Sequence, residues 1–121
     1  MLVNSSLTIY HKYLDPKEKL EKWIRFNYGT NEIPKVWWYG GKNVSLNKGL
    51  ENANDIKIRI PYDINPELDF NNFSVGDILV QGKLDFDITS IKDLSKYENY
   101  SIKSLSNNTF GINKHIHIEG K

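Results

Sequence analysis

Two histidines near the end of the chain have a spacing that could bring both side chains to one metal ion. His115 and His117 are two residues apart, so on a β-strand their imidazoles would share a face, and His11 is a conceivable third ligand. A zinc site also needs further ligands at a recognisable spacing, and no Asp or Glu pattern of that kind accompanies these histidines. We therefore interpret them as members of a solvent-facing strand and predict no metal ligands.

Two aspartates with the same spacing could divide the roles of general acid and general base. Asp85 and Asp87 would do so only if their environments drove their pKa values apart, and their place on the polar side of an alternating segment already accounts for them. Gly40 and Gly41 are followed by no Lys-Ser or Lys-Thr at the spacing of a phosphate-binding loop. Because no nucleophile, base and orienting group fall into a familiar arrangement, we predict that the chain is not an enzyme and has no catalytic residue or cofactor.

The aromatic run at residues 37–39 is the most distinctive group. Adjacent residues of a strand face opposite ways, so the run places bulky rings on both sides of a sheet. We expect one side to face the core, and the large rings on the other side to be covered either by the chain itself or by another subunit. Coverage by another subunit is an option because protein interfaces are enriched in Trp and Tyr. We predict an interface that also includes part of a later exposed segment, with the residues Trp37, Trp38, Tyr39, Asn65, Leu68 and Phe70. A surface on which nucleic-acid bases stack is the alternative, although only Lys35 and Lys42 flank the run.

The elements that must position these residues are β-strands. Residues 78–88 carry apolar residues or glycine at even positions and mostly polar residues at odd positions, which predicts a strand with one buried and one wet face. The same two-residue period returns in residues 55–60 and 115–119, and these segments are rich in β-branched residues. The chain is therefore predicted to be mainly β.

The first part of the chain allows two interpretations. Residues 7–14 alternate and predict a strand that ends before Pro16, because proline lacks the N–H that a ladder needs. Asp15, Pro16 and Glu18 then resemble the start of a helix. Residues 23–28 are instead rich in strand-forming aromatic residues, and a glycine follows them. We favour a β-hairpin over the helix.

The remaining segments are interpreted from their turn residues and their periodicity. The sequence predicts a strand at 36–39, a segment at 43–46 that pairs back on it, a loop at 48–54, a strand at 56–60 ended by Pro61, an exposed excursion at 63–72, a short helix from Ser90 to about Tyr97, and a final strand pair at 100–105 and 114–119.

Composition limits the remaining possibilities. The 121 residues match a single β domain, residues 1–121, and the fold class predicted is a small antiparallel barrel or sandwich with one short helix and long loops. Sixteen Lys and Arg against fifteen Asp and Glu leave a formal charge of +1, which favours no polyanionic partner. No cysteine is present, so disulfides and thiolate metal sites are excluded. We expect no signal peptide and no membrane span.

Several landmarks together resemble an uncharacterised family of small proteins encoded among the structural genes of tailed phages and prophages of Gram-positive bacteria. They are Leu7-Thr8-Ile9-Tyr10 with Lys12-Tyr13, Val36-Trp37-Trp38, Lys42-Asn43-Val44, Gly49-Leu50-Glu51, Ile60-Pro61, residues 76–82, Asp93-Leu94 and His117-Ile118-Glu119-Gly120-Lys121. The last of these has isoleucine where the resemblance leads us to expect a bulkier aromatic residue.

The resemblance implies a virion protein of the head-to-tail neck, and by analogy of fold a head-closure, or stopper, protein. Such a subunit would form a homo-oligomeric ring, would contact portal or adaptor proteins and tail proteins, and would reside in the host cytoplasm during assembly. The near-neutral charge suits a channel through which DNA passes without specific binding. The alternative function is a small β-barrel module that binds single-stranded nucleic acid or another ligand.

Overall fold

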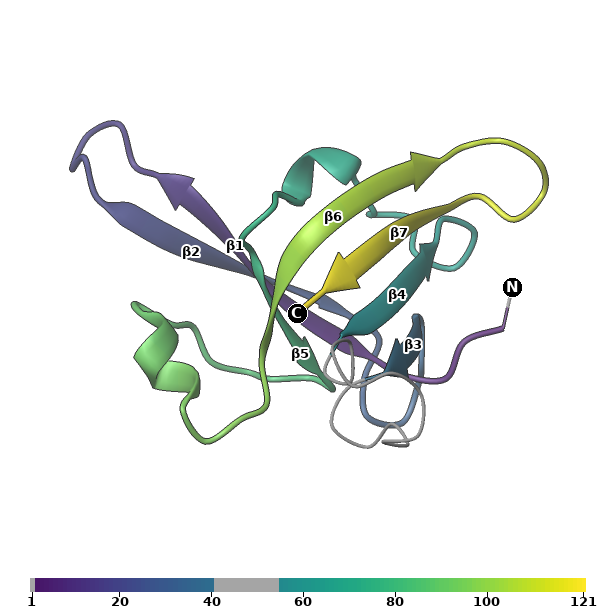
Figure 1. Ribbon diagram of the computed structural model, residues 1–121, viewed down its shortest axis with the longest axis horizontal. Helices are drawn as coiled ribbons and strands as arrows, with labels where there is room; N and C mark the ends of the chain where they lie inside the picture. The colour runs from purple at the N-terminus through teal and green to yellow at the C-terminus, as the bar shows by residue number, and fades with distance from the viewer. Residues whose placement is uncertain (1, 41–54) are drawn as a thin grey trace.

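The computed structural model describes residues 2–40 and 55–121, which are built mainly from β-strands (Figure 1). The strands of these residues form one antiparallel sheet in the order β2-β1-β5-β6-β7-β4-β3. They are β1 (Leu7–Leu14), β2 (Glu21–Tyr28), β3 (Trp37–Gly40), β4 (Ile56–Pro61), β5 (Ile78–Gln81), β6 (Tyr100–Asn108) and β7 (His115–Gly120). The predicted fold class, a mainly β antiparallel barrel or sandwich, is confirmed. No helix in the described ranges is long and apolar enough to cross a membrane.

The first two strands form the hairpin that the sequence favoured. Leu7 pairs with Tyr28 and Leu14 with Glu21, without a register shift. Asp15 caps a turn here and does not start a helix, because its carboxylate accepts from the Lys17 N–H at 2.9 Å. The helix-like signature around Asp15 therefore encodes the hairpin turn.

The segment before β1 pairs with the outer edge of β3 and with the residue before it. Ser5 and Val36 form an isolated antiparallel bridge, and the Asn4 and Ser5 N–H groups donate to the Val36 carbonyl at 2.9 and 3.0 Å. The Asn4 side chain continues this pairing, since its Nδ2 donates to the Trp38 carbonyl at 3.0 Å and its Oδ1 accepts from the Trp38 N–H at 2.8 Å. The Asn4 amide thus replaces a missing strand and protects the outer edge of β3 from pairing with another chain.

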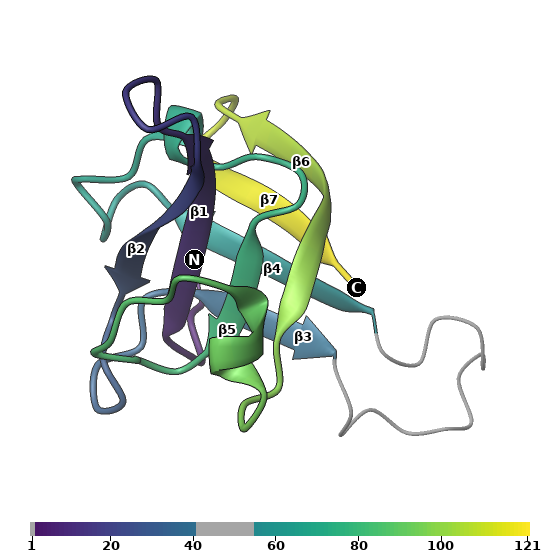
Figure 2. The same ribbon diagram turned by 90° about the vertical axis from the view of Figure 1, so that its left-hand side faces the viewer.

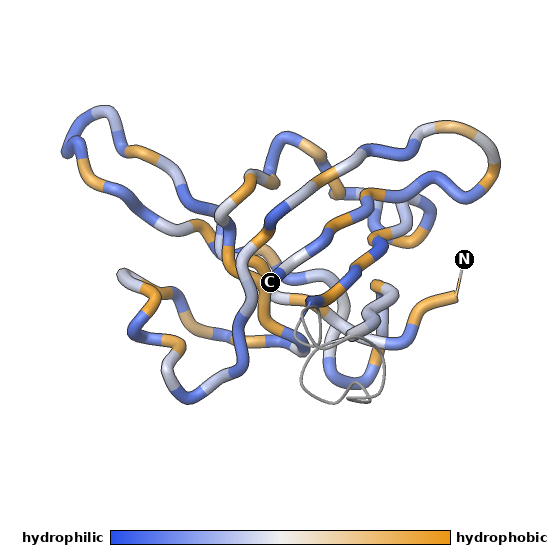
Figure 3. Tube along the Cα trace, in the orientation of Figure 1, coloured by the Kyte–Doolittle hydropathy of each residue, from blue (hydrophilic) through white to orange (hydrophobic). Residues whose placement is uncertain are grey.

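The sheet wraps around a core of aliphatic side chains, with β3, β4 and β7 behind β1 and β5 in Figure 2. The predicted alternation holds in β4 and β7: Ile58 and Ile118 are fully buried, while Lys57 and Arg59 between the isoleucines of β4 are exposed. Figure 3 shows this as alternating hydrophobic and hydrophilic colour along β4. A smaller cluster lies on the other face of β1, and its buried members are Tyr10, Ile78, Val80, Ile88 and Leu94.

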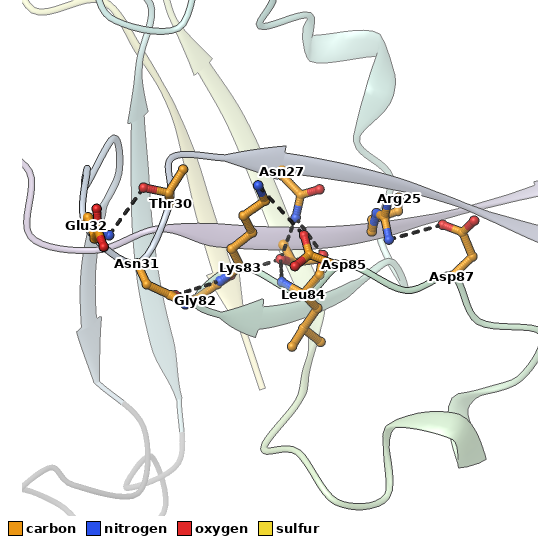
Figure 4. A network of polar contacts seen from close by, with 11 residues as sticks. Arg25, Asn27, Thr30, Asn31, Glu32, Gly82, Lys83, Leu84, Asp85 and Asp87 are labelled. Atoms are coloured by element: carbon orange, nitrogen blue, oxygen red, sulfur yellow. Dashed lines mark hydrogen bonds and ion pairs between the residues drawn. The ribbon is translucent and has the colours of Figure 1, made fainter.

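The prediction of one continuous strand over residues 78–88 is wrong, because β5 ends at Gln81. Gly82 has a φ of +97°, which turns the chain away from the sheet. Beyond it, the Leu84 N–H donates to the Thr8 hydroxyl at 2.9 Å. The Leu84 carbonyl accepts from the Asn27 amide at 3.2 Å, and Figure 4 shows these two residues. Side chains of β1 and β2 therefore take the place of a neighbouring strand, while Leu84 still packs against the smaller cluster.

The prediction that residues 63–72 form an exposed excursion is also wrong in part. Asn65 is fully buried and Leu68 is 8% exposed, because the Asn65 amide donates to the carbonyls of Lys35 and Pro61 at 3.0 and 2.8 Å. Phe70 is partly buried against the larger core cluster. The segment is therefore pinned to the body of the subunit.

The predicted short helix appears as a single 3-10 turn, Ile91–Leu94, and a second such turn covers Phe70–Asn72. The Asp93 carboxylate accepts from the N–H groups of Thr89 and Ser90, and these bonds lower the pKa of Asp93. The strand at 56–60, with its end at Pro61, and the final strand pair are confirmed. The predicted pairing segment at 43–46 and the loop at 48–54 lie outside the described residues.

Candidate interaction surface

The predicted aromatic run divides between the two faces of β3. Trp38 is 6% exposed and points into the core, where its ring meets Tyr100 edge-on at 5.8 Å. Trp37 and Tyr39 point outward and stack on each other, with ring centroids 5.9 Å apart and planes 5° from parallel. Trp38 is therefore unavailable to a partner, while Trp37 and the half-exposed Tyr39 remain candidates for the predicted interface.

Strand β4 adds two cations beside these rings. In the antiparallel register Arg59 lies opposite Trp37, and Lys57 lies opposite Tyr39. The Arg59 guanidinium carbon is 5.0 Å from the centroid of the Trp37 ring, a cation–π geometry. A partly buried ring, an exposed ring and a guanidinium are thus held in one arrangement by two paired strands.

Strand β7 completes the surface with a histidine and a carboxylate. His117 lies opposite Arg59, and Glu119 lies opposite Lys57. Partial burial lowers the pKa of His117, and Arg59, His115 and Lys57 act in the same direction while Glu119 opposes them. The outer β3–β4–β7 face is defined here as Trp37, Tyr39, Lys57, Arg59, His117 and Glu119.

The three histidines do not converge on a metal site. His115 is engaged at both ring nitrogens, because its Nδ1 lies 2.8 Å from the Asn113 carbonyl and its Nε2 lies 3.0 Å from the Asn108 amide. His11 belongs to β1, where its Nδ1 is 2.7 Å from a carboxylate oxygen of Asp77. In residues 2–40 and 55–121 no group of three His, Cys, Asp or Glu side chains could hold a metal ion.

The two aspartates are solvent-facing acids, as their alternation indicated. The side chains of Asp85 and Asp87 are 83% and 78% exposed, and they form loose ion pairs with Lys83 at 3.7 Å and Arg25 at 3.6 Å (Figure 4). Both carboxylates thus have ordinary surface surroundings, without the contrast in environment that an acid and base pair requires.

Two residues assigned to the predicted interface lie inside the subunit. Asn65 and Leu68 are buried, so neither presents a side chain to a partner. The polar composition of their segment suggested exposure, but the amide of Asn65 satisfies backbone carbonyls inside the fold. Phe70 is partly buried and offers a partner only part of its ring.

The comparisons with known proteins identify a family without assigning an activity. The model of DUF6751, described as a family of unknown function, matches residues 2–121. The chain belongs to this family. Neither the curated proteins nor the solved structures contain a match. The function of this member must therefore be argued from its own surface.

Sequence reasoning missed the cations of this face in the DUF6751 chain. Lys57 and Arg59 were visible as the polar half of an alternating segment, but the register that sets them beside the aromatic rings joins residues about twenty positions apart. Sequence reasoning also missed the carboxylate of Asp77, which is only 1% exposed. This carboxylate accepts hydrogen bonds from the Ser74 and Lys12 N–H groups and contacts His11. A single aspartate before a strand gave no signal that could have found it.

Proposed function

We propose that the chain is a structural subunit of the phage head-to-tail neck, a ring-forming head-closure or stopper protein without catalysis. The main support for the proposal is the patch of Trp37, Tyr39 and Arg59. Trp, Tyr and Arg are the residue types most enriched among the hot spots that supply most of the binding energy of protein interfaces. Their mutual stacking orders them before binding, so little conformational entropy is lost on contact. The landmarks given above supply the phage context.

The scaffold suits such a role. A ring subunit needs a rigid body with defined contact surfaces, and the outer β3–β4–β7 face lies on three hydrogen-bonded strands over a core of buried isoleucines. The formal charge of +1 suits a channel along which DNA slides. The proposed partners are further copies of the chain, portal or adaptor proteins, and tail proteins. The proposed location is the virion neck, after assembly in the host cytoplasm.

The proposal is tested by locating the chain in purified particles of a phage that encodes it. Mass spectrometry is expected to detect the chain in washed virions, and cryo-EM of the neck is expected to contain a ring of subunits with this sheet. Absence of the chain from complete particles would remove the proposal.

Complementation of a phage that lacks the gene tests the outer β3–β4–β7 face itself. The double variant Trp37→Ala, Tyr39→Ala is expected to fold but to yield few infectious particles, since each lost anchor of this kind typically costs about 2 kcal/mol or more of binding. Val75→Ala is the matched control, because Val75 is 67% exposed and lies outside this face. Full titre from a folded double variant would show that the face is not the interface.

A second candidate, a module that binds single-stranded nucleic acid, is favoured by the same outward-facing rings with Arg59 and Lys57 beside them. In this case a labelled oligothymidine would bind at low salt, binding would weaken as salt increases, and Trp37→Ala would reduce affinity by roughly 5- to 150-fold. Fluorescence anisotropy measures all three. No binding at low salt would exclude this candidate.

A further inference from the structure

The turn between β6 and β7 presents two large apolar side chains to solvent. Phe110 is 92% exposed and Ile112 is 97% exposed. Gly111 between them has a φ of +77°, a conformation that lets the chain reverse sharply and leaves both side chains at the tip. Figure 3 shows hydrophobic colour at this end of the hairpin. Apolar side chains displayed together in this way indicate a contact site.

An apolar groove lies beside the hairpin of β1 and β2. Its volume is about 470 Å³, within the size range of sites that bury a bound group. The groove is lined by Tyr13, Leu20, Glu21, Lys22, Trp23, Ile88 and Thr89, and Leu20 is 59% exposed. The groove therefore offers aromatic and aliphatic walls to an apolar side chain.

The tip and the groove lie at opposite ends of the long axis of the molecule. In Figure 1 the β6–β7 turn is at one end, and the β1–β2 hairpin is at the other. A subunit cannot fill its own groove from that distance. We propose that the Phe110 and Ile112 side chains of one copy of this chain occupy the groove of the next copy, in a heterologous contact that repeats from subunit to subunit. This contact would link neighbouring subunits of the proposed ring. The expectation that the repeat closes into a ring rests on the proposed function.

Charge favours a second copy over a membrane or a nucleic acid as the occupant. Lys114 is the one charged residue in the tip, residues 109–114, whereas anionic lipid or DNA backbones are bound by clusters of cations. The rim of the groove carries charges of both signs, and they are already paired within the subunit: Glu21 with Lys12 at 3.1 Å, and Lys22 with Asp15 and Glu18 at 2.9 Å. A tip with one cation therefore meets a rim whose charges are balanced, and the apolar side chains decide the contact.

The area of the contact indicates how the free subunit behaves. One phenylalanine and one isoleucine bury a few hundred Å² at most, whereas a stable interface buries roughly 800 Å² from each partner. A single contact is therefore weak, and repeated contacts around a closed ring reinforce one another. The free chain is expected to be mainly monomeric, with transient contacts that a crosslinker can trap.

Because the chain has no cysteine, single-cysteine variants test the contact directly. Ile112→Cys and Leu20→Cys are each treated with a short bis-maleimide at high protein concentration, alone and as an equal mixture. A heterologous contact predicts a crosslinked dimer from the mixture and little from either variant alone, and the double variant is expected to give a ladder of oligomers. Val75→Cys mixed with Leu20→Cys is the control and should not crosslink.

Three outcomes would overturn the inference. They are a mixture that crosslinks no better than the control, efficient crosslinking of Ile112→Cys with itself, and binding of the unmodified chain to anionic-lipid vesicles that Phe110→Asp abolishes. Phe110→Asp added to the Ile112→Cys variant should reduce crosslinking of the mixture at least tenfold. Its far-UV circular dichroism should be unchanged, because Phe110 is almost fully exposed.

The crosslinking uses purified chain and does not depend on where the protein resides. A failed crosslink combined with detection of the chain in the neck would remove the tip contact alone. A successful crosslink combined with absence from virions would remove the proposed function alone.

Discussion

Replacement of Thr8 by valine tests how the fold compensates for the early end of β5. Thr8 is fully buried, and its hydroxyl donates to the Gly82 carbonyl at 2.9 Å while it accepts from the Leu84 N–H at 2.9 Å and the Asn27 amide at 2.8 Å. Valine has nearly the same shape and cannot make any of these bonds. The variant therefore removes the Thr8 hydroxyl from the partly buried Leu84 N–H and Gly82 carbonyl.

The magnitude follows from the three lost bonds. At roughly 0.5–1.5 kcal/mol each, and with a gain of a few tenths from the higher strand propensity of valine, Thr8→Val should lower the free energy of unfolding by about 1–4 kcal/mol. For a chain of this size that corresponds to a fall in Tm of roughly 10 °C. Thr8→Ser is the matched control, because it keeps the hydroxyl and loses only a methyl group, at about 1 kcal/mol.

Urea unfolding followed by tryptophan fluorescence gives the free energies, and amide hydrogen exchange locates the effect. The Leu84 amide should exchange faster in Thr8→Val than in Thr8→Ser, because only the serine can still accept its hydrogen bond. A Thr8→Val variant as stable as the wild type, or more stable than Thr8→Ser, would refute the reasoning.

Three further perturbations test other parts of the fold. Because the pKa of His117 is lowered in the folded state, the unfolded chain binds a proton more readily, so the free energy of unfolding should fall as the pH drops below about 6.5; His117→Gln should flatten this dependence, and an unchanged pH profile in the variant would contradict the assignment. Asn65→Ala removes the N–H donors to the carbonyls of Lys35 and Pro61 and should cost about 1–3 kcal/mol in urea unfolding, with faster proteolysis of residues 62–72; no measurable loss would mean that the segment is not held by this amide. In Gly120→Ala the new Cβ would lie 2.9 Å from Cγ1 and 3.1 Å from Cδ1 of Ile56, which should cost about 1–3 kcal/mol, and Ile56→Val in the same chain should recover part of that loss; additive effects of the two changes would exclude the clash.

The strands could be predicted where the two-residue period coincided with burial on one side. Residues 56–60 and 115–119 carry isoleucines that lie in the core and polar residues that face out, so the period alone indicated strand and orientation. The period misled over residues 78–88. Gly82 breaks the ladder, and the later apolar residues of that segment keep their inward direction without a paired backbone. Alternation reports which side a residue faces and does not report what its backbone binds.

Only part of the candidate surface could be predicted from the sequence, for a related reason. The pairing of Trp37 with Arg59 depends on the register between β3 and β4, and the burial of Asn65 depends on a carbonyl thirty positions earlier in the chain. Both are long-range contacts for which local composition holds no information.

By itself the sequence determined a β protein, its final strand pair and the absence of disulfide chemistry, and it favoured the first hairpin over a helix, because these follow from local residue types and their period. Only the tertiary structure decided which aromatic rings face solvent, how Asn4 protects the edge of β3, and that an apolar hairpin tip and an apolar groove lie at opposite ends of the molecule. Those features arise when distant segments meet, and strand register fixes which side chains are then neighbours.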